Sequence, residues 1–256
     1  MEKYRNNRMM IKDQIRKELE QAAEADYRQF NEKLLPGVSH ICGVRLPKLR
    51  EMAKRIAKQD AQAYLEQMQQ KCNRDVATQT DICADRSDDV YFEEKMLYGL
   101  VVGYANVDTA GRQAWLDAFV PVIDNWSVCD SCCVTYKWMR RQADDWWDYV
   151  QRWALSDTEF GIRFGLVSML DHFVDEAHLQ LIFAVCSRIC HQGYYAKMAQ
   201  AWLVSVCFAE FPAQTYLFLQ EGCMDAFTHN KSIQKSCESY RVAKEWKEKL
   251  RALRKS

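Results

Sequence analysis

Four six-residue segments of the chain recur at a spacing of 34 residues, and this repeat constrains the fold more strongly than any other feature. The segments are YFEEKM from Tyr91, NWSVCD from Asn125, EFGIRF from Glu159 and GYYAKM from Gly193. Each has an aromatic residue in its second position. A period of this length is typical of helix pairs that stack on their neighbours and bury a shared apolar face. The sequence therefore predicts an all-α fold, an α-solenoid of helix pairs with a concave face.

Apolar residues follow a helical period through most of the chain, and no run alternates in the way that a strand requires. In the first part we expect helices near 8–24, before Pro36 and Gly37, from Leu46 onward, and near 60–70. Further on we expect helices over 91–105, 109–122, 126–139, 142–155, 158–173, 176–190, 194–209, 212–220 and 229–253. Residues 71–90 are polar without a clear period, so we expect a long connection there, inside a single domain that spans residues 1–256.

Composition favours a globular protein with long regular elements. Hydrophobic residues make up 48% of the chain, and with 9 Gly and 4 Pro few turns are expected. No run of 18 apolar residues occurs, and the charged N-terminal segment lacks the apolar centre of a signal peptide. The 11 cysteines are an odd number without a disulfide spacing, which favours reduced thiols. We therefore expect a cytoplasmic protein with no membrane partner.

Charge is balanced over the whole chain but unevenly distributed along it. Residues 1–58 carry 14 Lys and Arg against 8 Asp and Glu, and residues 229–256 carry 9 against 3, whereas residues 59–228 carry 12 against 24. A polyanionic partner would therefore be held by local basic patches and not by the charge of the whole protein. Solvated helix faces with uneven charge would give the same distribution.

The fifth position of the repeated segments carries a cation in three cases out of four. Together with the lysine one period further on, these cations are Lys95, Arg163, Lys197 and Lys231, and we call them the basic row. Equivalent positions of successive inner helices line up along a solenoid, so we expect the basic row to follow the concave face. In the second segment the fifth position is Cys129, and Asp130 follows it. Asp130 is thus a single acid where the repeat predicts a line of cations.

Trp126 precedes Asp130 by about one helical turn, so the two side chains share a face. An aromatic ring beside a carboxylate suits a positively charged ligand, or a reaction that passes through a cation. Each feature also has a simpler interpretation. A tryptophan usually belongs to the core, an aspartate in the first turns of a helix often caps it or favours its dipole, and the basic row is equally compatible with a solvated surface.

The sequence resembles the DNA alkylation repair (AlkD-like) family of HEAT-like-repeat DNA glycosylases. The resemblance covers nearly all of the chain after the first helix, and its patterns occur in order with the repeat spacing. They are GVRLPKLREMAKRI, IDNWSVCD, FGIRFGLVSML, GYYAKMAQAWLVSVCF and HNKSIQKSCESYRV. The resemblance implies a right-handed α-solenoid of HEAT-like helix pairs whose concave face binds DNA.

Carried over position by position, the resemblance implies a catalytic carboxylate at Asp130 with Trp126 beside it, and further site residues at Arg163 and Trp202. The implied reaction is hydrolysis of the N-glycosidic bond of cationic N3- or N7-alkylated purines in double-stranded DNA, without the base flipping that most glycosylases use. We expect a monomeric, monofunctional enzyme without a cofactor. The DNA backbone would be held by three cations of the basic row, Lys95, Lys197 and Lys231.

Two alternatives concern a metal and the absence of catalysis. The cysteines Cys129, Cys132 and Cys133 lie close together, but no second pair at zinc spacing follows them, and the histidines show no ligand spacing. We therefore expect no metal. The alternative to an enzyme is a noncatalytic HEAT-repeat module that binds branched DNA or a protein partner.

Overall fold

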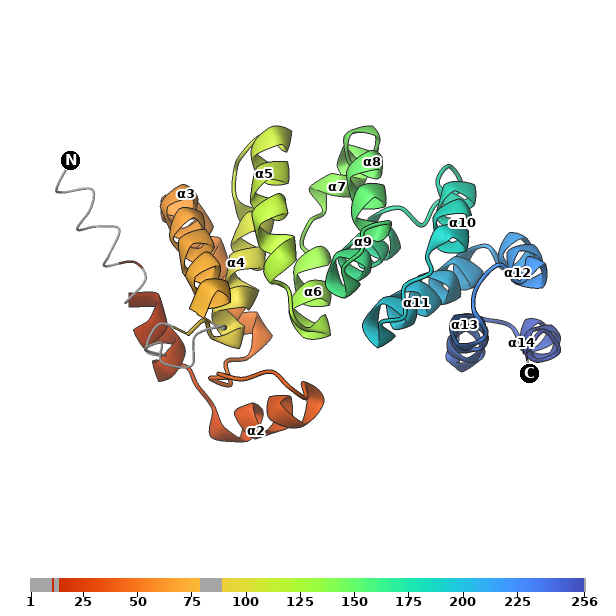
Figure 1. Ribbon diagram of the computed structural model, residues 1–256, viewed down its shortest axis with the longest axis horizontal. Coiled ribbons are helices and arrows are strands. Elements are labelled where there is room, and N and C mark those ends of the chain that lie inside the picture. Colours follow the sequence, from red (N-terminus) through yellow and green to blue (C-terminus); the bar gives the residue numbers. More distant parts are fainter. Residues whose placement is uncertain (1–10, 12–13, 79–88, 256) are drawn as a thin grey trace. The chain divides into compact units, whose positions relative to one another are not determined.

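The computed structural model describes residue 11 and residues 14–78 and 89–255. These residues form helices joined by turns and short loops, and no strand occurs among them (Figure 1). The all-α prediction is therefore confirmed. The chain divides into two compact units, Met1–Thr135 and Tyr136–Ser256. Within the described ranges, no helix is both long and apolar enough to cross a membrane.

The first unit is built around helix α4, which packs against α3, α5 and α6. Its helices are a segment at 14–21, α2 (Ala25–Leu34), α3 (Leu46–Thr78), α4 (Phe92–Tyr104), α5 (Thr109–Phe119), the short 3-10 helix η2 (Val120–Val122) and α6 (Trp126–Cys133). Gly99 lets the neighbours of α4 approach closely. A Cβ atom on Gly99 would lie 2.4 Å from the Phe119 ring and 2.5 Å from Cys132 Sγ. This close packing fixes α6, and with it Trp126 and Asp130, against α4.

Helix α3 differs from the expected pattern in its middle and at its end. Asp60 has φ −162° and ψ 73°, so the helix breaks there into two halves, and its carboxylate accepts a hydrogen bond from Ala63 N at 3.1 Å. The second half continues to Thr78, so residues 71–78 of the expected connection are helical. Lys71 is buried and binds Glu94 at 2.8 Å. A charged residue therefore occupies a buried position of the helix, and the apolar period does not show there. Residues 79–88 of the expected connection lie outside the described residues. So do residues 8–10 and 12–13 of the first expected helix.

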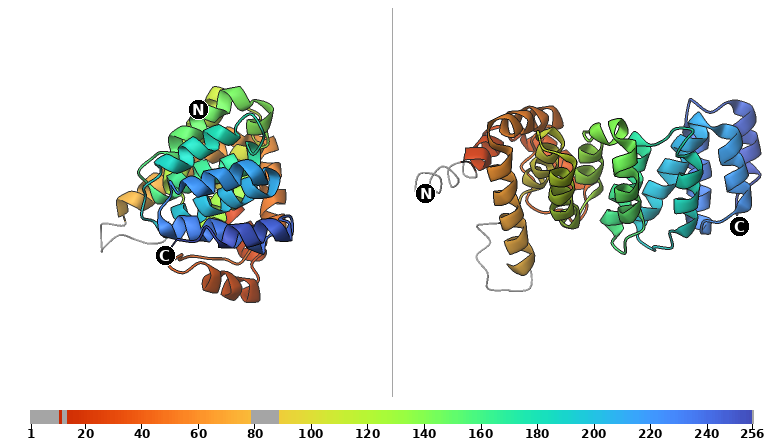
Figure 2. Two further views of the ribbon diagram at one scale, coloured as in Figure 1. Left: turned by 90° about the vertical axis from the view of Figure 1, so that its right-hand side faces the viewer. Right: turned by 90° about the horizontal axis from the view of Figure 1, so that it is seen from above.

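The second unit consists of helices that pack in sequence order. They are α7 (Trp138–Arg141), α8 (Ala143–Ala154), α9 (Glu159–His172), α10 (Leu179–Arg188), α11 (Tyr194–Glu210), α12 (Pro212–Glu221), α13 (Ala226–Glu238) and α14 (Lys244–Arg251). Helix α9 packs against α8 and α11, and α11 packs against α13 (Figure 2). Gly165 brings α9 against α8, because a Cβ atom there would lie 2.3 Å from the Ala154 backbone nitrogen.

The 34-residue repeat marks the starts of helices. Helices α4, α6, α9 and α11 begin at residues 92, 126, 159 and 194, and α13 begins at residue 226. Side-chain caps fix two of these starts. Asn125 Oδ1 accepts a hydrogen bond from Val128 N at 2.9 Å, and Asp225 Oδ1 accepts from Phe227 N at 3.1 Å. The aromatic second position of each segment therefore lies in the first turn of a helix.

Two expected helices are interrupted. The helix expected over 126–139 ends at Cys133, where the Thr135 hydroxyl donates a 2.6 Å hydrogen bond to the Cys132 carbonyl. The helix expected over 229–253 is split into α13 and α14, and Ser239 Oγ accepts a hydrogen bond from Arg241 N in the break. Serine and threonine hydroxyls compete with the helical backbone for its hydrogen bonds, which explains both interruptions.

Candidate active site

Trp126 and Asp130 lie one turn apart on the less buried side of α6. Both side chains are partly exposed, whereas Val128, Cys129, Cys132 and Cys133 on the same helix are fully buried. Trp126 is the first residue of the helix, directly after the Asn125 cap. The structure thus brings these two expected site residues together, as the four-residue spacing predicts.

The buried side of α6 carries the cysteines Cys129, Cys132 and Cys133. The Cys132 thiol packs against the Met96 carbonyl oxygen at 3.6 Å. Burial raises the pKa of Cys132 well above its usual value; the charge of Arg50 opposes this rise and that of Asp130 adds to it. Asp130 therefore lies on a helix whose other side is buried and of low polarity.

Lys95, the first member of the basic row, is held by an acid just before the start of α6. Its ammonium donates a 2.7 Å hydrogen bond to Asp124 Oδ2, and Asp124 Oδ1 accepts one of 2.8 Å from Asn125 Nδ2. The Lys95 side chain is 13% exposed. Lys95 thus connects α4 to the residue that caps α6, and its charge is offset by Asp124.

Lys197 repeats this arrangement in the second unit. Its ammonium binds Asp225 Oδ1 at 3.5 Å and Gln192 Oε1 at 2.9 Å, and its side chain is 15% exposed. Asp225 is the cap of α13. Lys231 instead donates to an uncharged partner, Gln234 Oε1, at 2.8 Å.

Arg163 and Trp202 lie in the second unit, on α9 and α11. The Arg163 guanidinium is buried and donates a 3.0 Å hydrogen bond to the carbonyl oxygen of Tyr195, in the first turn of α11. The Trp202 side chain is partly exposed. The four expected catalytic residues are therefore divided between the two units, with Trp126 and Asp130 in the first and Arg163 and Trp202 in the second.

Sequence reasoning missed the partners of the basic row. Each of its first three cations reaches the start of a later helix: Lys95 that of α6, 29 residues on, Arg163 that of α11, 32 residues on, and Lys197 that of α13, 28 residues on. The acid Glu159 also reaches the start of α11, because its Oε1 accepts a 2.6 Å hydrogen bond from Tyr195 N. The sequence held one signal for these partners. An Asp lies just before the start of a helix, and it follows a Lys of the basic row by nearly one repeat period.

Two buried carboxylates of α4 were also missed. Glu93 accepts hydrogen bonds from the backbone nitrogens of Cys42, Gly43 and Val44, at 2.9, 2.7 and 3.2 Å. Glu94 binds Arg16 at 2.7 Å and Lys71 at 2.8 Å. Burial alone would raise the pKa of Glu94, but the Arg16 hydrogen bond and the Lys71 charge hold it below its usual value. These acids anchor the N-terminal segments on α4 and have a structural role.

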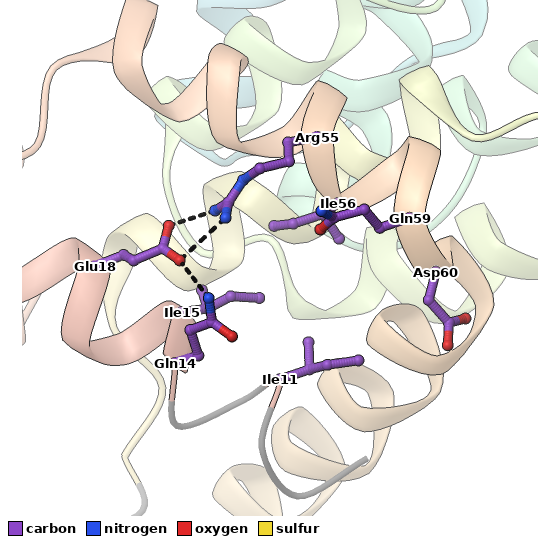
Figure 3. A pocket seen from close by; sticks show the side chains of 8 residues that line it. All are labelled: Ile11, Gln14, Ile15, Glu18, Arg55, Ile56, Gln59 and Asp60. Carbon is purple, nitrogen blue, oxygen red and sulfur yellow. Dashed lines mark hydrogen bonds and ion pairs between the residues drawn. The ribbon is translucent and has the colours of Figure 1, made fainter. Parts of the chain in front are cut away.

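A small pocket lies between the 14–21 helix and α3 (Figure 3). It has a volume of about 50 Å³ and is lined by Ile11, Gln14, Ile15, Glu18, Arg55, Ile56, Gln59 and Asp60. Glu18 pairs with Arg55 and accepts a hydrogen bond from Gln14 at 3.2 Å. None of the expected site residues lines this pocket. Of its two acids, Glu18 pairs with Arg55 and Asp60 accepts a hydrogen bond from Ala63 N, so we do not assign the candidate active site to it.

The comparison with known families confirms the family resemblance seen in the sequence. A family model described as DNA alkylation repair enzyme matches residues 15–237. The chain belongs to the DNA alkylation repair enzyme family. A role in DNA repair follows from this membership, and DNA is the implied partner. No significant match is found among curated proteins or among solved structures.

The family match extends over both units and contains all seven expected site residues. In this DNA alkylation repair enzyme, no group of three or more His, Cys, Asp or Glu side chains in the described ranges is arranged to hold a metal ion. No disulfide joins the described cysteines.

Proposed function

We propose that this DNA alkylation repair enzyme is a monofunctional glycosylase that hydrolyses the N-glycosidic bond of cationic N3- or N7-alkylated purines in duplex DNA. The proposal includes a right-handed solenoid of HEAT-like helix pairs with a concave DNA-binding face. It also includes a single functional domain, since the family match crosses the boundary between the two units. The protein acts as a cytoplasmic monomer without a cofactor.

The observation that carries the proposal is the placement of Asp130 on the partly exposed side of α6, one turn from Trp126 and on a helix whose other side is buried. At the equivalent positions of α4, α9 and α11 the chain has a cation that reaches the start of another helix. In α6 that position is Cys129, which is buried, and the charge beside it is negative. An acid among cations suits a reaction that develops positive charge.

The chemistry needs only such an acid and water. An alkylated purine carries a positive charge and leaves with the electron pair of the N-glycosidic bond as a neutral base, while the sugar becomes oxocarbenium-like. An ionised Asp130 about 4 Å away would stabilise this cation by about 4 kcal/mol at an effective dielectric constant near 20, or roughly a thousandfold in rate. Asp130 then orients the water that attacks C1′ and accepts its proton.

The other site residues hold the DNA around this step. The indoles of Trp126 and Trp202 border the deoxyribose and keep bulk water away from the cation. Arg163 contributes positive charge from α9 toward a backbone phosphate. Lys231 supplies more of the phosphate attraction than Lys95 or Lys197, because those two lysines already face aspartates.

The decisive experiment measures base release from methylated duplex DNA with enzyme in excess. Wild type is expected to release 7-methylguanine or 3-methyladenine, and Asp130→Asn is expected to lose about a thousandfold in rate. Asp148→Asn removes an exposed carboxylate of α8 and serves as the matched control, with an unchanged rate. Absence of release by the wild type would refute the enzyme proposal.

One observation favours a second function, a noncatalytic module that binds branched DNA or a protein. Asp124 and Asp225 offset two cations that were expected to hold DNA, and the net charge of the chain is zero. Such a module would bind a four-way junction more tightly than duplex DNA, and Asp130→Asn would leave its affinity unchanged. A salt titration separates the DNA-binding and protein-binding cases, since only phosphate contacts weaken steeply with salt.

A further inference from the structure

Four aromatic rings touch one another across the first turns of α9, α11 and α13. Phe160 stacks on Tyr195 with ring centres 5.5 Å apart and planes inclined by 29°. Tyr195 meets Tyr194 edge to face at 5.4 Å, and Tyr194 meets Phe227 at 6.1 Å. We call this set the aromatic strip. It lies entirely within the second unit and joins three successive inner helices.

The aromatic strip is unusual because its outer members are exposed. Tyr194 is 57% exposed and Phe227 is 41% exposed, whereas the large aromatic side chains Trp146, Phe164 and Phe208 of the same unit are completely buried. Isolated exposed aromatic residues need no explanation, but rings that touch and remain accessible mark a surface that binds something. Packing within the unit therefore does not account for the outer half of the strip.

Two lysines of the basic row flank the exposed end of the strip. The Lys197 and Lys231 ammonium groups lie 6.0 and 5.8 Å from the centre of the Phe227 ring. Both ammonium groups lie over the ring, so cations that can pair with a ligand phosphate adjoin the exposed aromatic surface.

The acids near the strip are already engaged. The Asp225 carboxylate accepts hydrogen bonds from Phe227 N, Thr228 N and the Thr228 hydroxyl, and it pairs with Lys197. Burial alone would raise the pKa of Asp225, but the Thr228 hydrogen bonds hold it below its usual value. Glu159 accepts a hydrogen bond from Tyr195 N. Neither acid presents an unengaged negative charge to an anionic ligand.

We infer that the aromatic strip binds single-stranded DNA by stacking bases on Tyr194 and Phe227, with phosphates held by Lys197 and Lys231. Accessible rings in a row with cations beside them are the arrangement by which proteins bind single strands without reading sequence. A duplex would use the strip poorly, because its base faces are covered by neighbouring bases. The inference does not depend on glycosylase activity.

The test is fluorescence anisotropy with a labelled, unalkylated thymidine oligomer of about 12 nucleotides. Tyr194→Ala and Phe227→Ala are each expected to weaken binding about tenfold, because stacking on one ring is lost. Tyr194→Phe keeps the ring and should bind like the wild type, whereas Tyr194→Leu keeps the bulk without the ring and should weaken binding like alanine. Both positions are exposed, and unchanged thermal unfolding will show that the variants fold.

Tyr240→Ala is the matched control, since Tyr240 is a fully exposed tyrosine of the same unit outside the strip. Its affinity should equal that of the wild type. Lys231→Gln should lower the salt slope of single-strand binding by about 0.7. The inference is overturned if the wild type does not bind the oligomer, if Tyr194→Leu binds normally, or if Tyr194→Ala weakens a duplex of the same length equally.

Two further binding measurements distinguish this inference from RNA binding and from the glycosylase proposal. A uridine oligomer that binds tenfold more tightly than the thymidine oligomer would overturn the assignment to DNA, and weaker or equal binding supports it. Asp130→Asn should bind the thymidine oligomer like the wild type. If base release fails while this binding is seen, the glycosylase proposal falls and the inference about the strip stands.

Discussion

The ammonium of Lys95 lies 2.7 Å from Oδ2 of Asp124. Asp124 immediately precedes Asn125, which caps the helix of Trp126 and Asp130. Because the Asp124 side chain also accepts a hydrogen bond from Asn125, Lys95 acts on the candidate site through the cap. The same cation was expected to hold DNA, and the two roles make different predictions.

Lys95→Gln tests which role dominates. We expect a loss of up to about 1 kcal/mol in the free energy of unfolding, since the pair is partly exposed, and a fall in the rate of base release at saturating DNA. Lys197→Gln breaks the equivalent pair at the start of α13 and should leave that saturated rate unchanged. If Lys95→Gln weakens only DNA affinity, the positioning role is excluded.

Asn125→Ala should shorten or loosen the start of α6. The Asn125 side chain is buried and its Oδ1 satisfies Val128 N, so we expect a loss of about 1 kcal/mol in the free energy of unfolding. Asn125→Ser keeps a capping oxygen and should lose less. Urea titrations of the three proteins will measure the difference, and equal stability of the alanine and serine variants would contradict the capping role.

Glu94→Gln should make stability less dependent on pH. The pKa of Glu94 in the folded protein lies below its usual value of 4.5, so the unfolded chain binds the proton more readily. The stabilisation is fully present above about pH 4.5 and is lost as the pH falls through the lower folded-state pKa. Removing one partner of this buried cluster should cost about 3 kcal/mol near pH 7.

The measurement for Glu94 is the free energy of unfolding from pH 3 to pH 7. The difference between wild type and Glu94→Gln should be constant at neutral pH and shrink below pH 4.5. Glu51→Gln, which removes an exposed carboxylate of α3, is the control and should show no comparable change. A difference that grows toward acid pH would contradict the sign of the pKa shift.

Gly165→Ala should destabilise the second unit. Its Cβ atom would lie 2.3 Å from the Ala154 backbone nitrogen, which cannot move without shifting α8, so we expect a loss of about 2 kcal/mol. Gly111→Ala is the control, because its nearest neighbour is a side-chain oxygen of Asp108 at 3.0 Å. Thermal unfolding of both variants will show whether backbone approach sets the cost.

The sequence predicted the starts of the helices at the repeated segments, α4, α6, α9 and α11, better than it predicted where helices end. The repeat recorded starts because a cap followed by an aromatic residue is a local signal, as at Asn125 and Trp126. Ends depended on single hydroxyl groups such as that of Thr135. The end of α3 was missed because Lys71 is buried, where it pairs with Glu94. Such contacts across distant residues leave no periodic trace.

The same distinction holds for the candidate site. Trp126 and Asp130 were predicted as neighbours because four residues of helix suffice to bring them together. The partners of Lys95 and Lys197 are nearly one repeat away, so their positions depend on how successive helices pack. Hydropathy and charge along the chain do not carry that information.

The burial of the thiols on the helix of Asp130 affects how the protein reacts with electrophiles. The thiolate is the form of cysteine that electrophiles attack, and burial raises the pKa of Cys132 well above its usual value and that of Cys186 to about 12. Cys190 and Cys223 are exposed and would be modified first, far from α6 in the sequence. A protein of DNA alkylation repair can therefore keep its core intact in the presence of the alkylating chemicals that create its proposed substrates.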